Sequence, residues 1–117
     1  MIAKLRRVAH LRSGDKGNTA TISVIAYAPE FYPLIAAQID EAAIGQVFAD
    51  ASGPVRRYLV PAIGALNFTV EGALGGGVSR NLAMDVYGKA LCAALLALPV
   101  DVPAHLVPLL QGPAHQA

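Results

Sequence analysis

A polar, glycine-containing stretch near the N-terminus is the first place where this sequence could bind a ligand. Its residues are Ser13, Gly14, Asp15, Lys16, Gly17 and Asn18. Glycines permit positive φ and expose backbone N–H groups, so such a loop beside a lysine could hold a phosphate or carboxylate. The spacing is not that of a Walker loop. Ordered hairpin loops commonly use the same residue types, with Asp15 and Asn18 bonding to nearby backbone. Both interpretations stay open.

A second candidate begins with three consecutive glycines, Gly75, Gly76 and Gly77. They would let a ligand or another backbone come close, and Ser79 and Arg80 could then contact an anion. A flexible connector explains the same residues equally well. Upstream, the amide of Asn67 lies between two apolar residues and needs hydrogen-bond partners if it is buried.

The remaining reactive side chains form no recognisable catalytic or metal-binding set. His10, His105 and His115 have no metal-ligand spacing with another His, Cys, Asp or Glu. The one cysteine, Cys92, lies in an apolar helical run and is expected in the core. No Ser-His-Asp set can be assigned. The catalytic residues are therefore unknown, no metal or other cofactor is expected, and enzymatic activity is left undecided.

Composition limits the classes of protein and of partner. Hydrophobic residues make up 55% and charged residues 15% of the 117 residues, which excludes a disordered chain. A net charge of +1 leaves no basic field for a nucleic acid. The uninterrupted apolar stretch over residues 90–100 is about half of a membrane span, so a cytoplasmic protein without a membrane partner is expected. Such an apolar small chain also favours a homo-oligomer or a subunit.

The positions of these candidates depend on the elements around them. Residues 5–11 and 19–28 have the pattern of two strands in a hairpin, with 12–18 as its loop. A helical region follows over residues 31–49, with Pro33 in its first turn and a break near 40, where Asp40 caps a second piece. Residues 55–60 are a strand.

The segment 65–74 is ambiguous, because its apolar residues fit both a strand and a helix that ends at Gly75. We favour the helix, since residues 78–84 alternate cleanly as a strand. A last helix starts at Asp85 and ends at Pro99. If 65–74 is a strand, the triple glycine and Arg80 arrive beside Asp15 and Lys16 within one chain. If it is a helix, only a neighbouring chain can bring the two loops together.

The order strand, strand, helix, strand, strand, helix predicts an α+β fold with a four-stranded antiparallel sheet and helices on one face. This is a ferredoxin-like arrangement in which the first strand of the hairpin replaces the usual last strand. That first strand and residues 55–60 would form its edges. The pairs Arg6-Arg7 and Arg56-Arg57 are interpreted as solvated charges that protect them. A closed dimer or ring is expected, with residues 106–110 docking on a neighbour.

Five short motifs occur in an order that resembles the C-terminal domain of AtuA-like proteins, the acyclic terpene utilisation family. They are RSGDKGN at 12–18, YPL at 32–34, GALNF at 64–68, GALGGG at 72–77, and Asp85 followed by GKAL at 88–91. The resemblance covers about residues 5–98 and implies a ferredoxin-like domain over residues 1–98, with 99–117 as a proline-rich extension.

The family unit occurs either fused behind a larger domain or as a separate short protein beside it, and the resemblance implies the separate form here. The expected role is an accessory subunit of a larger AtuA-like partner in bacterial breakdown of acyclic terpenes or related acyl-CoA compounds. The alternative is an independent enzyme or anion-binding module with its site at an oligomer interface. The resemblance assigns no catalytic residue.

Overall fold

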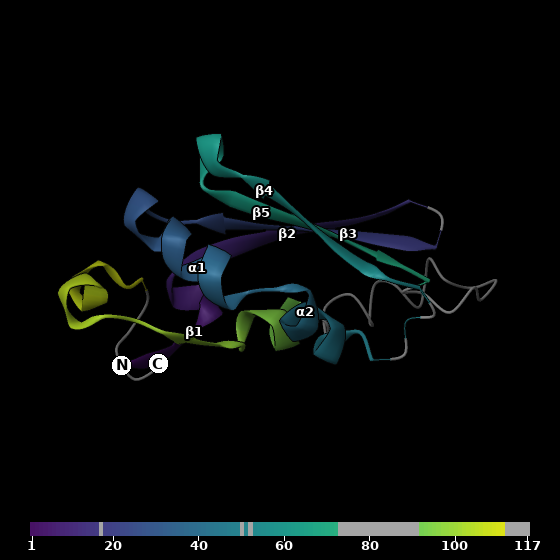
Figure 1. Cartoon of the computed structure of the whole chain (residues 1–117). Helices are drawn as coiled ribbons and strands as arrows, with labels where there is room; N and C mark the ends of the chain where they lie inside the picture. The colour runs from purple at the N-terminus through teal and green to yellow at the C-terminus, as the bar shows by residue number, and fades with distance from the viewer. Residues whose placement is uncertain (17, 50, 52, 73–91, 112–117) are drawn as a thin grey trace.

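The main feature of the fold is a four-stranded antiparallel sheet (Figure 1). The structure is a computed structural model that describes residues 1–16, 18–49, 51, 53–72 and 92–111. The strands of this sheet in spatial order are β2 (Ala9–Lys16), β3 (Thr19–Ala26), β5 (Ala65–Glu71) and β4 (Val55–Val60). A separate two-stranded sheet joins β1 (Ile2–Lys4) to β6 (Pro99–Asp101). The hairpin strand β2 occupies one edge and β4 the other, which confirms the two predicted edge strands.

The first strand of the hairpin lies further along the chain than the sequence suggested, and the second is two residues shorter. The first strand begins only at Ala9, because Leu5–Arg7 is the short 3-10 helix η1. It then continues to Lys16, which lies opposite Thr19, so only residues 17 and 18 connect the strands. The predicted loop over 12–18 was therefore wrong. Because no described helix covers one face of this sheet, polar side chains alternate along the strand without burial, and β3 offers a partner of equal length.

The two helices α1 (Tyr32–Gln38) and α2 (Glu41–Val47) follow β3 through the 3-10 turn η2 (Pro29–Phe31). The predicted break near residue 40 is confirmed. The Asp40 side chain accepts a hydrogen bond of 2.9 Å from the backbone N–H of Ala43, which caps α2. A cap and a break are local signals, which is why the sequence alone could place them.

The preference for a helix over residues 65–74 was wrong, because residues 65–71 form strand β5. This strand pairs with β3 on one side and β4 on the other, so it is central in the sheet. Leu66, Phe68 and Val70 are fully buried on the helix side, as the alternating pattern permits. Pairing on both edges therefore outweighs the helical spacing. The predicted strand 78–84 and the start of the predicted last helix lie outside the described residues.

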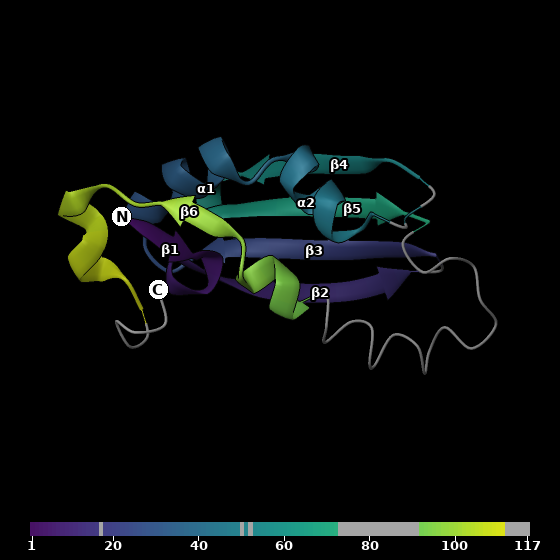
Figure 2. The ribbon, with the colours of Figure 1, turned by 90° about the horizontal axis from the view of Figure 1, so that it is seen from below.

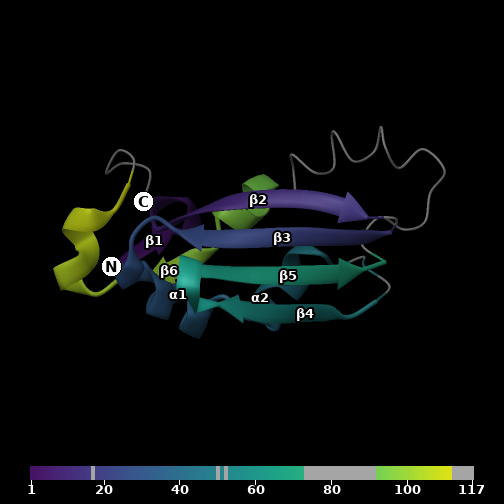
Figure 3. The same cartoon turned by 90° about the horizontal axis from the view of Figure 1, so that it is seen from above.

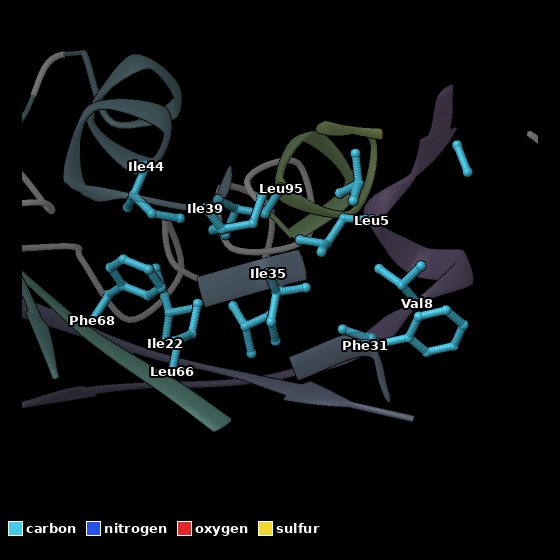
Figure 4. Packing of buried hydrophobic residues seen from close by; sticks show 14 of the residues in the cluster. Leu5, Val8, Ile22, Phe31, Ile35, Ile39, Ile44, Leu66, Phe68 and Leu95 are labelled. Atoms are coloured by element: carbon cyan, nitrogen blue, oxygen red, sulfur yellow. The ribbon is translucent and has the colours of Figure 1, made fainter. Parts of the chain in front are cut away.

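The core lies between the sheet and the helical layer. Ile22, Leu66 and Phe68 of the sheet face side chains of the opposite layer, among them Ile35 and Leu95 (Figure 4). Leu95 belongs to a helical segment over residues 92–96, which agrees with the C-terminal part of the predicted last helix. Neither α1 nor α2 covers the other face of the sheet (Figure 3).

Residues 99–111 pack into the same core. Strand β6 pairs with β1 on the helix side of the main sheet (Figure 2). Val100 and Val102 are fully buried, and the 3-10 helix η4 (Ala104–Leu109) buries Leu106. Leu106 therefore packs in its own chain, which corrects the expectation that it docks on a neighbour.

Two of the four paired arginines are internal, which corrects their interpretation as solvated strand charges. Arg7 lies in η1 and is 5% exposed, and its Nε donates to the carbonyl of Gln111 at 2.9 Å. Arg57 donates through Nη1 to the carbonyls of Ala36 at 2.7 Å and Ile39 at 3.1 Å. Both contacts are distant in sequence, so charge spacing gave no sign of them.

Candidate functional site

Three cross-strand rows on the open face of the sheet contain one residue from each of the four strands. In an antiparallel sheet, directly opposed residues share a face, so the pairings define each row. The row nearest the β3–α1 connection contains His10, Ile25, Ala65 and Val60. The middle row contains Arg12, Ser23, Asn67 and Tyr58. The third row contains Gly14, Thr21, Thr69 and Arg56. Beyond it, at the hairpin, Thr19 is opposite both Lys16 and Glu71 in register. The face thus changes from apolar at one end to polar at the other.

Asn67 lies in the middle row and has a hydrogen-bond partner. The Ser23 hydroxyl donates to Asn67 Oδ1 at 2.8 Å, between the neighbouring strands β3 and β5. The two residues are directly opposed in register. The bond therefore ties two central strands on the uncovered face, and the predicted need of this amide for a partner is met within the sheet.

The candidate residues of the hairpin do not form one cluster. Ser13 lies on the helix side, where its Oγ is 3.5 Å from Cys92 Sγ. Gly14 lies on the open face opposite Thr21, and an added Cβ there would come within 3.3 Å of the Thr21 hydroxyl. The backbone of Asp15 and Lys16 belongs to β2. Adjacent residues of a strand point to opposite faces, so Ser13 and Gly14 lie on different sides of the sheet.

The other candidates are distributed over a larger distance. Asn18 is half-buried at the hairpin end, whereas Asn67 lies about 14 Å away, four strand residues along β5. Gly17, the glycines 75–77, Ser79 and Arg80 lie outside the described residues. Because β5 ends with Glu71 opposite Thr19, the chain does leave the sheet at the hairpin end. The ligand-binding role of these residues stays a prediction.

A cleft of about 320 Å³ lies at the opposite end of the sheet, where the sequence suggested no site. The connection after β3, the start of α1 and the 3-10 turn η3 (Pro61–Ile63) form its walls. They contribute the residues Ala26, Tyr27, Ala28, Pro29, Tyr32, Pro61, Ala62, Ile63 and Gly64. None of the lining residues is an Asp, Glu, Lys, Arg or His, so the cleft suits an uncharged group.

Local contacts hold the cleft in shape. The backbone N–H of Ala26 donates to the carbonyl of Gly64 at 2.9 Å, which joins two of its walls. Gly64 has φ = 64°, a left-handed conformation that a glycine adopts without steric cost. On the rim, the ring centroids of Tyr27 and His10 are 5.4 Å apart. Tyr27 is 46% exposed and Ile63 is 64% exposed, so the rim presents apolar side chains to solvent.

A comparison with known protein families identifies the family of this chain. Residues 3–101 match the sequence model of the AtuA ferredoxin-like domain. The chain belongs to this family. The match confirms both the resemblance seen in the sequence and the ferredoxin-like fold of this AtuA-like domain. No curated protein and no solved structure matched the chain.

Two further findings concern the described part of this AtuA-like domain. No three His, Cys, Asp or Glu side chains there come together in a group that could hold a metal ion. No helix among the same residues is long and apolar enough to cross a membrane.

The cleft carried a weak signal in the sequence of the domain. Tyr27, Pro29, Tyr32, Pro61 and Gly64 all lie at boundaries of elements, where aromatic and proline side chains often line grooves. In the sequence, Pro61 and Gly64 indicate only a bend after the predicted strand 55–60. Correct placement of β5 brings the turn after β4 beside the end of β3. Because residues 65–74 were wrongly expected to form a helix, the sequence did not predict this cleft.

Proposed function

We propose that this AtuA-like domain is an accessory or assembly subunit of a larger AtuA-like protein, which supplies most of the active site. The complex would act in bacterial catabolism of acyclic terpenes or related acyl-CoA or carboxylic acid compounds, in the cytoplasm. The domain would bind through the cleft and its rim, and hold the larger protein in an assembled form.

The exposed apolar rim of the cleft is the observation that supports this proposal. Tyr27 and Ile63 are 46% and 64% exposed, and they flank walls without charged side chains. The central parts of protein interfaces are depleted of charge and enriched in aromatic residues such as tyrosine. Single exposed apolar residues are ordinary, but a tyrosine and an isoleucine beside an uncharged cleft form a continuous contact surface.

Copurification from the native cell tests the proposal. An affinity-tagged chain expressed at its natural level should bring down a much larger AtuA-like protein encoded nearby. The same pull-down with Ile63→Glu, which places a charge on the rim, should lose that protein. A chain that is stable and active without such a partner would contradict the proposal.

The alternative function is a small-molecule binder or independent enzyme, and the cleft volume favours it as the second candidate. A volume of about 320 Å³ is at the lower end of the range for ligand pockets. A thermal-shift screen with coenzyme A thioesters and small carboxylic acids separates the two proposals. A ligand that binds the isolated folded chain raises its Tm by mass action, whereas an accessory subunit shows no shift without its partner.

A further inference from the structure

Strand β4 has only one hydrogen-bonded neighbour among the described strands, β5. An edge strand directs the N–H and C=O groups of alternate residues outward, where another strand can pair with them. Two large apolar side chains of β4 are also exposed, Tyr58 at 51% and Leu59 at 55%. They lie on opposite faces of the sheet, so an added strand would find an apolar contact on each face.

The usual protection of an edge is weak on this strand. Natural edge strands avoid association with exposed charges, prolines or bulges. The sequence of β4 contains no proline, and its two charges are Arg56 and Arg57. The Arg57 guanidinium is turned inward to the carbonyls of Ala36 and Ile39, and its Nε is 3.8 Å from Glu41. Arg56 is thus the one exposed charge that β4 presents.

We propose that β4 pairs antiparallel with β4 of a second copy of this chain, around a twofold axis at Tyr58. The two main sheets would join into one continuous sheet, with the helices of both copies on the same side. This inference is independent of the proposed accessory role, since β4 supplies no residue of the cleft lining.

The charges of β4 select the register of this pairing. Opposed residues must lie on the same face if both helical layers are to stay on one side. An axis at Arg57 would place two guanidinium groups opposite each other, which is unfavourable. An axis at Leu59 would place Arg57 opposite Pro61, which has no N–H to donate.

An axis at Tyr58 keeps the two Arg57 side chains apart and moves Pro61 to the end of the pairing, opposite Val55. It places Tyr58 opposite itself and Leu59 opposite the aliphatic stem of Arg57. Val60 then lies opposite Arg56, whose guanidinium is diagonal to Tyr58 of the other copy and within reach of its ring. Strand β4 contains both the arginine and the tyrosine of this contact, so two copies of it complement each other. A second copy of the chain is therefore the partner that we infer.

Cysteine cross-linking tests the register directly. In a Cys92→Ser background, Tyr58→Cys should form a covalent dimer on mild oxidation, because opposed Cβ atoms lie about 5 Å apart. Val55→Cys, on the same strand but on the helix side of the sheet, is the control. In the proposed register its two copies are about 20 Å apart, so it should stay uncross-linked. Equal cross-linking at both positions would overturn the register.

Sedimentation of the full chain tests the dimer itself. The unmodified protein should sediment as a dimer, and Tyr58→Asp should raise the dimer Kd by about 100-fold, because two carboxylates would oppose each other. Leu109→Asp, at an exposed apolar residue outside β4, should leave the Kd unchanged. A monomeric unmodified chain at high concentration, or a Kd that Tyr58→Asp does not change, would overturn the proposal.

Discussion

Arg57 joins two elements of the fold through one guanidinium group. It reaches from β4 to the carbonyls of Ala36 and Ile39, at the C-terminal end of α1, where helices leave carbonyl groups without intrahelical partners. A cation there also interacts favourably with the helix dipole. The arginine therefore fixes the helix against the edge strand, in addition to its 3.8 Å ion pair with Glu41.

Replacement of Arg57 by methionine should lower the free energy of unfolding by about 1–3 kcal/mol, because two half-buried carbonyls lose their donor. Urea denaturation measures this. Arg12→Met is the matched control, since Arg12 is an exposed arginine on the opposite edge strand and should change stability by less than about 0.5 kcal/mol. Equal effects of the two substitutions would contradict the role assigned to Arg57.

Residue roles with local causes could be predicted from the sequence, and those with distant partners could not. The Asp40 cap depends on a residue three positions away, and Pro33 lies in the first turn of its helix as expected. The partners of Arg7 and Arg57 come from other elements, at Gln111 and in α1. Arginine pairs on predicted strands indicate solvated charge, and only the tertiary structure shows which of them turn inward.

At the scale of elements, β5 decides how the sheet is arranged. Its alternation of buried and less buried residues suits a strand, but the apolar residues of the same segment also have helical spacing. Pairing with β3 and β4 resolves the ambiguity, and no local signal contains that information. The chain then returns to the hairpin end, as expected for the strand alternative. The hairpin itself was predicted, whereas its length was not.

The turn between α2 and β4 gives a prediction at this scale. An added Cβ at Gly53 would lie 2.7 Å from Glu71 Cβ and 2.8 Å from the Glu71 carbonyl oxygen. Gly53→Ala should therefore push the end of β5 aside and cost about 1–3 kcal/mol of unfolding free energy.

Gly45→Ala in α2 is its control, because the added Cβ meets only Val55 Cγ2 at 3.9 Å. It should stabilise the chain by up to about 1 kcal/mol, since alanine is the better helix former. Urea denaturation of both variants provides the measurement. A Gly53→Ala variant as stable as the unmodified chain would show that the contact between this turn and Glu71 is not tight.

At the scale of the whole molecule, the segment after the last helix completes the core. Strand β6 pairs with β1 on the helix side of the main sheet. Val100, Val102 and Leu106 of this segment are buried. The reciprocal bonds between Arg7 and Gln111, each 2.9 Å, hold its end to the start of the chain. In the sequence, prolines and short apolar runs indicate that residues 99–117 form an extension. Nothing local showed that this extension returns to the N-terminus.

A chain stopped after residue 98 should be unfolded, or should melt at least about 10 °C lower, because three buried apolar side chains are lost at about 2 kcal/mol or more each. A chain stopped after Gln111 retains every contact described for this segment and is the control. Circular dichroism melting compares the two. A Tm that is the same for both would mean that residues 99–111 contribute little to the core.

The most direct test of the accessory role is the affinity of the purified domain for the larger AtuA-like protein found by copurification. Titration calorimetry should give a defined complex, and Ile63→Glu should weaken it by about 30-fold or more, as expected for a charge at the centre of an apolar contact. Leu109→Glu, which changes an exposed apolar residue in η4, should bind like the unmodified chain. No binding, or equal binding by both variants, would contradict the proposed contact through the cleft.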